Sequence, residues 1–269
     1  MREIGMEPWS IAIAASAIFA TSLIFSMFGR GGGEFYLPIM LTVLSLTYYT
    51  CAGISLFLIM LQGLSMIIVY HGKHRLVDWQ LALALGLTVG ACSFLGGFLS
   101  YRIPAYLLKA SFSTFLLISA YFIYRGISVK PVKGRFGVWA RKLGDNTYYI
   151  NMLYITLPVA AAAFTAGMVG ISGGGLIIPI CVLFGGVPIR IAMGTNTFLV
   201  LISSSMSFTG HLIRGGFNPI LGGVLGCAVI AGAQIGSRFH VRLNERTLRR
   251  AFSTILVAAA AWMLLKIFL

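Results

Sequence analysis

The chain has 269 residues, of which 58% are hydrophobic and only 10% are charged, with a formal net charge of +14. Soluble domains average about 25% charged residues, so this composition excludes a water-soluble globular protein and indicates one embedded in the lipid bilayer. In a membrane protein an excess of Lys and Arg marks the cytoplasmic face. No nucleic-acid-binding motif accompanies the charge, and the four cysteines lack metal-ligand spacing, so we expect neither a nucleic-acid partner nor a metal site.

Apolar segments recur along the whole chain. They fall at roughly 9–28, 35–46, 52–70, 79–99, 105–124, 152–169, 175–184, 192–212, 218–236 and 249–269. Several have the roughly 20 residues that a spanning helix needs, whereas the second and seventh are short. The first segment lacks a basic start and a cleavage site, so we expect it to be a helix and not a signal peptide. We therefore predict an all-α polytopic membrane protein with about 7 to 10 membrane segments.

Two glycine clusters interrupt these segments in the same register. Phe28-Gly-Arg-Gly-Gly-Gly-Glu-Phe-Tyr-Leu-Pro38 lies 141 positions before the run from Met168 to Pro179, so that Gly29, Gly32, Gly33 and Pro38 repeat as Gly170, Gly173, Gly174 and Pro179. An interior glycine costs a helix roughly 0.5 to 1 kcal/mol relative to alanine, and three in a row do not continue one stably. We predict a broken helix, a turn, and a short helix beginning at Glu34 or Gly175 with unpaired first amides.

The correspondence extends well past the glycine clusters. Gly53 and Phe57 match Gly194 and Phe198, and after one residue of slippage Gly96 and Arg102 match Gly236 and Arg242. Such internal duplication is typical of transporters. We predict a first transmembrane repeat over 1–125, a basic linker over 126–150 and a second transmembrane repeat over 151–269.

Charge distribution predicts that the two repeats are inverted. The linker is rich in Lys and Arg, which places it in the cytoplasm, and the segments counted outward from it put Lys73 and Arg75 there too. Parallel repeats would put the five arginines of 238–250 outside, so inversion fits the positive-inside rule better. Both termini of this multi-pass protein of the cell membrane then lie outside.

His240, in a basic inner loop, is expected to be solvated. The glycine-flanked helices are either re-entrant hairpins or full spans.

Inverted repeats bring two helix breaks together near the membrane midplane, where helix N-termini face an anionic substrate. Backbone amides of the two clusters, the Arg30 guanidinium and two polar side chains of the eighth apolar segment are the candidate groups. The candidate substrate-binding residues are Arg30, Gly31, Gly32, Gly33, Ser172, Gly173, Gly174, Gly175, Thr195 and Asn196. The alternative for the small polar residues is that they only permit close helix packing.

Glu34 is the acidic residue that we expect to be embedded, since the other five acids fit termini or loops. We hypothesise that Arg30 attracts the anion while Glu34 holds Arg30 or exchanges a proton during coupling. The alternative places both side chains at the membrane surface, with Glu34 only capping the short helix.

The motifs carry a family resemblance. Gly170-x-Ser-Gly-Gly-Gly-x-x-x-Pro179, then Ala192-Met-Gly-Thr-Asn196, and the degenerate copy Gly29-x-Gly-Gly-Gly-x-x-x-x-Pro38 resemble the TauE/SafE sulfite-exporter family of membrane permeases. The resemblance spans essentially the whole chain. It implies a cofactor-free carrier, not an enzyme, that exports small sulfur-containing anions such as sulfite or organosulfonates. This chain departs in two respects: Arg30 and Glu34 stand where the second cluster has Ile171 and Gly175, and the first copy has Ser55-Leu56 in place of the polar pair Thr195-Asn196.

Two other functions stay open at this stage. A passive anion channel would use the same helix N-termini. An intramembrane serine hydrolase would use Ser172 of Gly170-Ile-Ser-Gly173 as nucleophile and His211 as base. The first cluster has Gly31 at the place of the serine, and the whole glycine and proline framework is duplicated, which favours the transporter.

Overall fold

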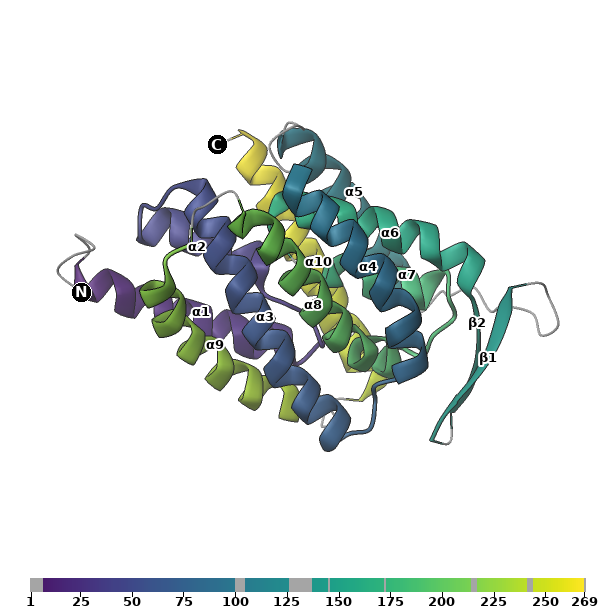
Figure 1. The fold of residues 1–269 in the computed structure, drawn as a ribbon. Helices are drawn as coiled ribbons and strands as arrows, with labels where there is room; N and C mark the ends of the chain where they lie inside the picture. The colour runs from purple at the N-terminus through teal and green to yellow at the C-terminus, as the bar shows by residue number, and fades with distance from the viewer. Residues whose placement is uncertain are drawn as a thin grey trace.

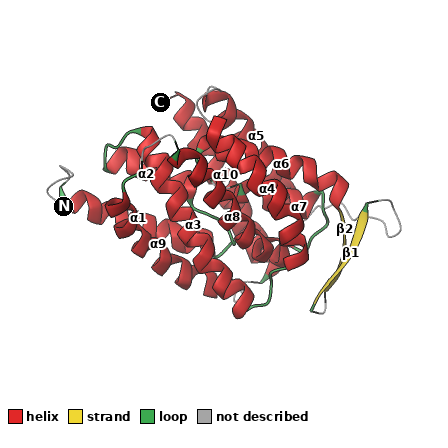
Figure 2. Ribbon diagram, viewed as in Figure 1, coloured by secondary structure: helices red, strands yellow, loops and turns green. Residues whose placement is uncertain are grey.

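The computed structural model describes residues 7–99, 105–125, 137–144, 146–171, 173–213, 217–240 and 244–268. These residues form ten helices and one two-stranded hairpin (Figures 1 and 2). The elements are α1 (Pro8–Ser26), α2 (Gly33–Val43), α3 (Tyr48–Gly72), α4 (Trp79–Leu99), α5 (Ala105–Arg125), β1 (Val138–Leu143), β2 (Asn146–Asn151), α6 (Met152–Val169), α7 (Gly174–Leu183), α8 (Ile189–Leu212), α9 (Pro219–Phe239) and α10 (Glu245–Phe268).

Six helices of the described part are long and apolar enough to cross a membrane. They are Pro8–Ser26, Thr50–Gly72, Trp79–Leu99, Met152–Val169, Ile189–Leu212 and Pro219–Phe239. Large apolar side chains such as Leu87 and Leu157, which are 83% and 77% exposed, face outward as lipid-facing side chains do. The predicted all-α polytopic membrane protein is therefore confirmed.

The five helices on either side of the hairpin follow the same order: a long helix, a short helix and three long helices. α1 packs against α9, and α6 packs correspondingly against α4. α3 packs against its counterpart α8, and α5 packs against its counterpart α10. Exchanging the two halves thus turns the α1–α9 contact into the α6–α4 contact and leaves the α3–α8 and α5–α10 contacts unchanged. The division of the chain into repeats over 1–125 and 151–269 stays a prediction.

Two glycines at matching positions allow the closest of these approaches. A Cβ atom at Gly96 of α4 would overlap the Phe164 carbonyl oxygen of α6. A Cβ atom at Gly236 of α9 would likewise overlap the Leu23 carbonyl oxygen of α1. Small residues permit such backbone contact between membrane helices. Helices α4 and α9 are therefore each docked on the first helix of the other half.

The linker contains structure that the sequence did not lead us to expect. β1 and β2 pair antiparallel, with Trp139 opposite Ile150 and Leu143 opposite Asn146. The hairpin stands at one end of the helix bundle, and both the start of α1 and the end of α10 lie away from it (Figure 1). The rest of the predicted linker, from 126 to 136, lies outside the described residues.

Candidate functional site

The two helix breaks have the same backbone geometry. Gly29 and Gly170 have φ of +62° and +79°, a left-handed conformation that glycine adopts at little cost. The following amide in each copy bonds to the carbonyl five residues earlier, Arg30 N to Phe25 O at 3.3 Å and Ile171 N to Ala166 O at 3.1 Å. This is the hydrogen bond of a helix end closed by a left-handed residue. The chain therefore leaves both helices through the same left-handed turn, although α1 ends three residues before Gly29 and α6 ends directly before Gly170.

The short helices also correspond. α2 begins at Gly33 and α7 at Gly174, one residue earlier than predicted. Pro38 lies inside α2 and Pro179 inside α7. Each break is thus a helix end, a turn of glycines and a new short helix, as the sequence predicts.

The structure brings the two breaks into contact. Asn196 Nδ2, from α8, donates a hydrogen bond to the Gly29 carbonyl at 2.8 Å. The same nitrogen lies 2.7 Å from where a Cβ atom at Gly174 would stand. A Cβ atom at Gly33 would lie 3.3 Å from Ile171 Cα, across the junction. Asn196 therefore joins the end of α1 to the start of α7.

Arg30 and Glu34 form an ion pair inside the protein. Their exposed fractions are 0% and 3%, so both side chains are enclosed by the protein. The Arg30 guanidinium lies 5.2 Å from the centre of the Phe25 ring and against Gly175, where a Cβ atom would overlap Nη2. A cation from the first break is thus held at the N-terminus of α7.

Several polar atoms around this junction have no hydrogen-bond partner among the described residues. They are Arg30 Nε and Nη1, Glu34 Oε2, Asn196 Oδ1 and Ser55 Oγ. Unsatisfied polar atoms are costly inside a protein, and more so when they carry charge. The free guanidinium N–H groups are donors, so the chemistry that would satisfy Arg30 is a small anion with oxygen acceptors.

Gln62 of α3, which was not among the predicted site residues, holds the first glycine turn. The side chain is fully buried. Its Oε1 accepts hydrogen bonds from the Gly32 amide at 3.0 Å and the Tyr36 hydroxyl at 2.8 Å, while Nε2 donates to Ser26 Oγ at 2.8 Å. The available signal was an amide side chain in the middle of an otherwise apolar segment.

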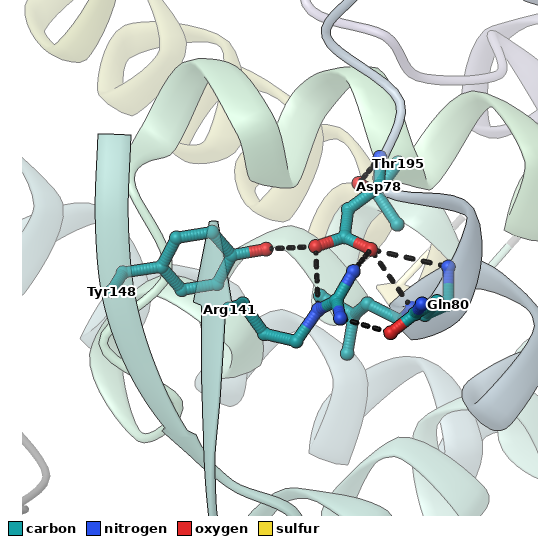
Figure 3. A network of polar contacts seen from close by, with 6 residues as sticks. Asp78, Gln80, Arg141, Tyr148 and Thr195 are labelled. Carbon is teal, nitrogen blue, oxygen red and sulfur yellow. Dashed lines mark hydrogen bonds and ion pairs between the residues drawn. The ribbon is translucent and has the colours of Figure 1, made fainter. Parts of the chain in front are cut away.

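Thr195 lies beside Asn196 but makes a different contact. Its hydroxyl oxygen accepts a hydrogen bond from the backbone amide of Asp78 at 3.1 Å, as Figure 3 shows. This bond ties α8 to the segment just before α4. Thr195 therefore connects the junction of the breaks to the end of the molecule that carries the hairpin.

Asp78 is the second buried carboxylate, whereas we expected it to be one of the acids in termini or loops. Its oxygens accept hydrogen bonds from Arg141 Nε at 3.0 Å and Nη2 at 2.6 Å, and from the Tyr148 hydroxyl at 2.6 Å (Figure 3). The carboxylate also caps α4 through the amides of Gln80 and Leu81. One carboxylate thus fixes the hairpin to the helix bundle.

The hydrogen bonds of Asp78 decide its ionisation. Burial alone would raise the pKa of Asp78, but the hydrogen bonds from Arg141, Tyr148 and the Leu81 amide outweigh burial and hold the pKa below its ordinary value of 3.8. Asp78 is therefore ionised at neutral pH, and the hairpin stays fixed.

His240 is buried and not solvated, which corrects the sequence-based expectation. Its exposed fraction is 0%, and Nδ1 bonds to the Met27 carbonyl at 2.7 Å, close to the end of α1. Its ring lies 4.8 Å from that of Tyr70, whose hydroxyl donates to the same carbonyl at 3.0 Å. The chain after α9 is thus packed against the first break.

The other predicted site residues lie in or beside the two glycine turns, except Ser172, which lies outside the described residues. Gly31 is buried in the first turn, and Gly173 precedes α7, where a Cβ atom would lie 3.0 Å from Ile177 Cδ1. His211 bonds through Nε2 to the Gly167 carbonyl at 3.4 Å. Among the described residues no group of three or more His, Cys, Asp or Glu side chains is placed to hold a metal ion.

Comparison with known proteins gives a consistent result. The family model described as sulfite exporter TauE/SafE matches residues 13–263. A probable membrane transporter protein of Bacillus subtilis, YunE, is 24% identical over 82% of this chain and 84% of its own length. Probable membrane transporter proteins of Methanocaldococcus jannaschii and Haemophilus influenzae are 24% and 23% identical and cover 92% and 90% of this chain, and 92% and 91% of their own lengths. No solved structure matches significantly.

Proposed function

Because this chain belongs to the TauE/SafE family and is a multi-pass membrane transporter, we propose that it exports small sulfur-containing anions by alternating access. Sulfite and organosulfonates such as sulfoacetate are the substrate class. The sulfur and the export direction come from the family description, whereas the relatives are named only as transporters. The junction of the two breaks supplies the physical support for an anionic substrate.

The observation that carries the proposal is the position of Arg30. It is fully buried, two of its nitrogens have no partner among the described residues, and it lies against Gly175 in the first turn of α7. A helix N-terminus offers free amides and the positive end of a dipole. A sulfite or sulfonate group has oxygens that accept from both a guanidinium and such amides.

Glu34 is the group that would couple anion binding to proton uptake. In the absence of an anion its carboxylate neutralises Arg30. An anion that takes over Arg30 leaves the buried carboxylate without its partner, which is costly unless the charge is removed. We infer that Glu34 takes up a proton when the anion binds, so that the proton and the anion are transported together.

Three basic segments gather at the hairpin end and support the proposed orientation. Arg141 of the hairpin binds Asp78, which follows the segment with Lys73 and Arg75. His240, at the end of α9, packs against Tyr70 at the end of α3. The positive-inside rule places this end in the cytoplasm and the two termini outside. The helix breaks then lie between two inverted repeats, as alternating access requires.

Ligand-induced stabilisation of the purified protein tests the proposal. A ligand that binds only the folded state adds about 2.7 kcal/mol at one hundred times its dissociation constant. We expect sulfite or sulfoacetate to raise the melting temperature, and chloride at equal ionic strength to leave it unchanged. An equal response to all these anions would contradict a selective sulfur-anion carrier.

A further inference from the structure

We propose that the carried anion binds at one place only, the N-terminus of α7 in the second break, with Arg30 of the first break as its anchor. This inference rests on the proposed function, because it names the binding site of the same anion. The two breaks share one backbone geometry, so two equivalent sites are the natural alternative. The side chains around the breaks distinguish the two arrangements.

The first break is already filled by the protein. The Gly32 amide, which an anion would use, donates to Gln62 Oε1 at 3.0 Å. The Tyr36 ring covers the same glycine, because a Cβ atom at Gly32 would lie 2.7 Å from Tyr36 Cζ. The Tyr36 hydroxyl donates to the same Gln62 oxygen at 2.8 Å. Gln62 and Tyr36 thus occupy the place that an anion would take.

The second break lacks both of these side chains. Ile177 stands at the position of Tyr36 and packs over Gly173, 3.0 Å from where a Cβ atom would stand, but it carries no hydroxyl. Ser203 stands at the position of Gln62. The Ser203 hydroxyl bonds to a carbonyl of its own helix at 3.3 Å and does not reach back to the turn. The amides of Gly173–Gly175 have no partner among the described residues. Gly173 therefore keeps the amide donor that the matching Gly32 gives to Gln62.

The two breaks also differ in charge, because only the first contributes an arginine, Arg30. It leaves its own turn and lies against Gly175, the residue that matches Glu34. Its own counterpart in the second copy is Ile171, so no matching cation crosses in the opposite direction. A buried cation with free N–H groups therefore reaches the N-terminus of α7 while it stays paired with Glu34 of α2. The single site is built from both halves of the chain.

Two matched residues of α3 and α8 allow a direct comparison of the breaks. Asn196, beside Gly174, carries two N–H donors on Nδ2, and one of them donates to the Gly29 carbonyl. Its counterpart Ser55 is buried, with an unpartnered Oγ. A neutral hydroxyl without a neighbouring cation is a poor anion anchor. Ser55 is the counterpart of Asn196 in the first half and has no part in the proposed site, so it provides the control.

Titration calorimetry of the purified full chain tests the inference, with sulfite, sulfoacetate, sulfate and nitrate as probes. We expect one anion bound per chain. Arg30→Gln and Asn196→Ala should each weaken binding by about tenfold or more, because a hydrogen bond to a charged group is lost. Ser55→Ala should keep the affinity within about threefold of the wild type.

Folding is checked separately, because Arg30 and Asn196 also lie in the core. Each variant is compared with the wild type by its melting temperature without anion. If Arg30→Gln does not fold, Arg30→Lys replaces it: the charge remains but the planar donor fork is lost, so weaker binding is still expected.

The outcomes separate this inference from the proposed function. Two anions per chain, or a larger loss from Ser55→Ala than from Asn196→Ala, would overturn the single site and leave an anion carrier standing. One bound sulfate or nitrate, lost in Arg30→Gln, with no response to sulfite or sulfoacetate, would support the single site and overturn the sulfur substrate. No binding of any of the four anions would overturn both.

Discussion

Gly29 and Gly170 lie 141 residues apart and share a left-handed backbone, with φ of +62° and +79°. Each lies in the turn after the first helix of its half, and the amide that follows it bonds to the carbonyl five residues back. A residue with a Cβ atom adopts this conformation at a cost of about 1 kcal/mol or more. The common geometry of the two breaks therefore depends on these two glycines.

Alanine at either glycine should destabilise the protein. We expect Gly170→Ala to lower the free energy of unfolding by about 1–2 kcal/mol. Gly29→Ala should lower it further, because its Cβ atom would overlap the Met193 carbonyl oxygen, whereas the one at Gly170 would lie 3.0 Å from Ala52 Cβ. Gly223→Ala is the control, since a Cβ atom there meets nothing within 4 Å. Thermal unfolding in detergent measures all three, and equal melting of Gly29→Ala and Gly223→Ala would contradict this account.

Asp78→Asn should release the hairpin from the helix bundle. Asparagine still caps α4, but it loses the ion pair with Arg141, and a hydrogen bond to a charged group contributes about 1.5–3 kcal/mol. We expect faster proteolysis between β1 and β2 and a lower melting temperature.

The stabilisation by Asp78 should decrease as pH falls. The pKa of Asp78 is depressed in the folded state, so its stabilisation is fully present above the ordinary value of 3.8 and is lost as pH falls through the folded value. The difference in stability between the wild type and Asp78→Asn should therefore be constant from about pH 5 to 8 and shrink below about pH 4. A difference that already disappears at pH 6 would show that Asp78 is not held as described.

His240 should make the protein sensitive to mild acid. Burial lowers the pKa of His240 from 6.5 to about 4. Between these values the unfolded chain takes up a proton that the folded chain does not, so stability falls as pH falls, by about 1.4 kcal/mol per unit. We expect His240→Gln to show a shallower decline between pH 6.5 and 4. Parallel declines of the two proteins in chemical unfolding would refute this contribution.

The sequence predicted the features that depend on backbone chemistry. Two glycine turns, each followed by a short helix with an internal proline, could be located because glycine and proline act on the local chain wherever they stand. Burial of Glu34 also followed from the sequence, since the acid sits within an apolar stretch. These features needed no knowledge of which helices pack together.

The features that were missed depend on contacts between distant segments. Asp78 is buried because Arg141 and Tyr148, more than 60 residues later, reach its carboxylate. Gln62 and His240 are buried because α3 and the end of α9 pack on the first break. The hairpin had a local signal, in the alternation of Tyr148 and Ile150 after a glycine turn, that the charge of the linker obscured.

Glu34→Gln should uncouple transport from protons. Glutamine keeps the size of the side chain and an oxygen that accepts from Arg30, but it cannot take up a proton. In proteoliposomes we expect wild-type sulfite flux to change with an imposed pH difference across the membrane and the variant flux to ignore it. The same response to pH in both proteins would remove Glu34 from coupling.

Anion flux through Arg30→Gln tests the central claim most directly. Proteoliposomes are loaded with labelled sulfite or sulfoacetate, and efflux is followed against internal concentration for the wild type and the variant. We predict saturable efflux in the wild type, which a passive channel would not show, and a loss of about tenfold or more in the variant, because the buried cation that binds the anion is gone. Wild-type efflux from correctly folded Arg30→Gln would contradict the account.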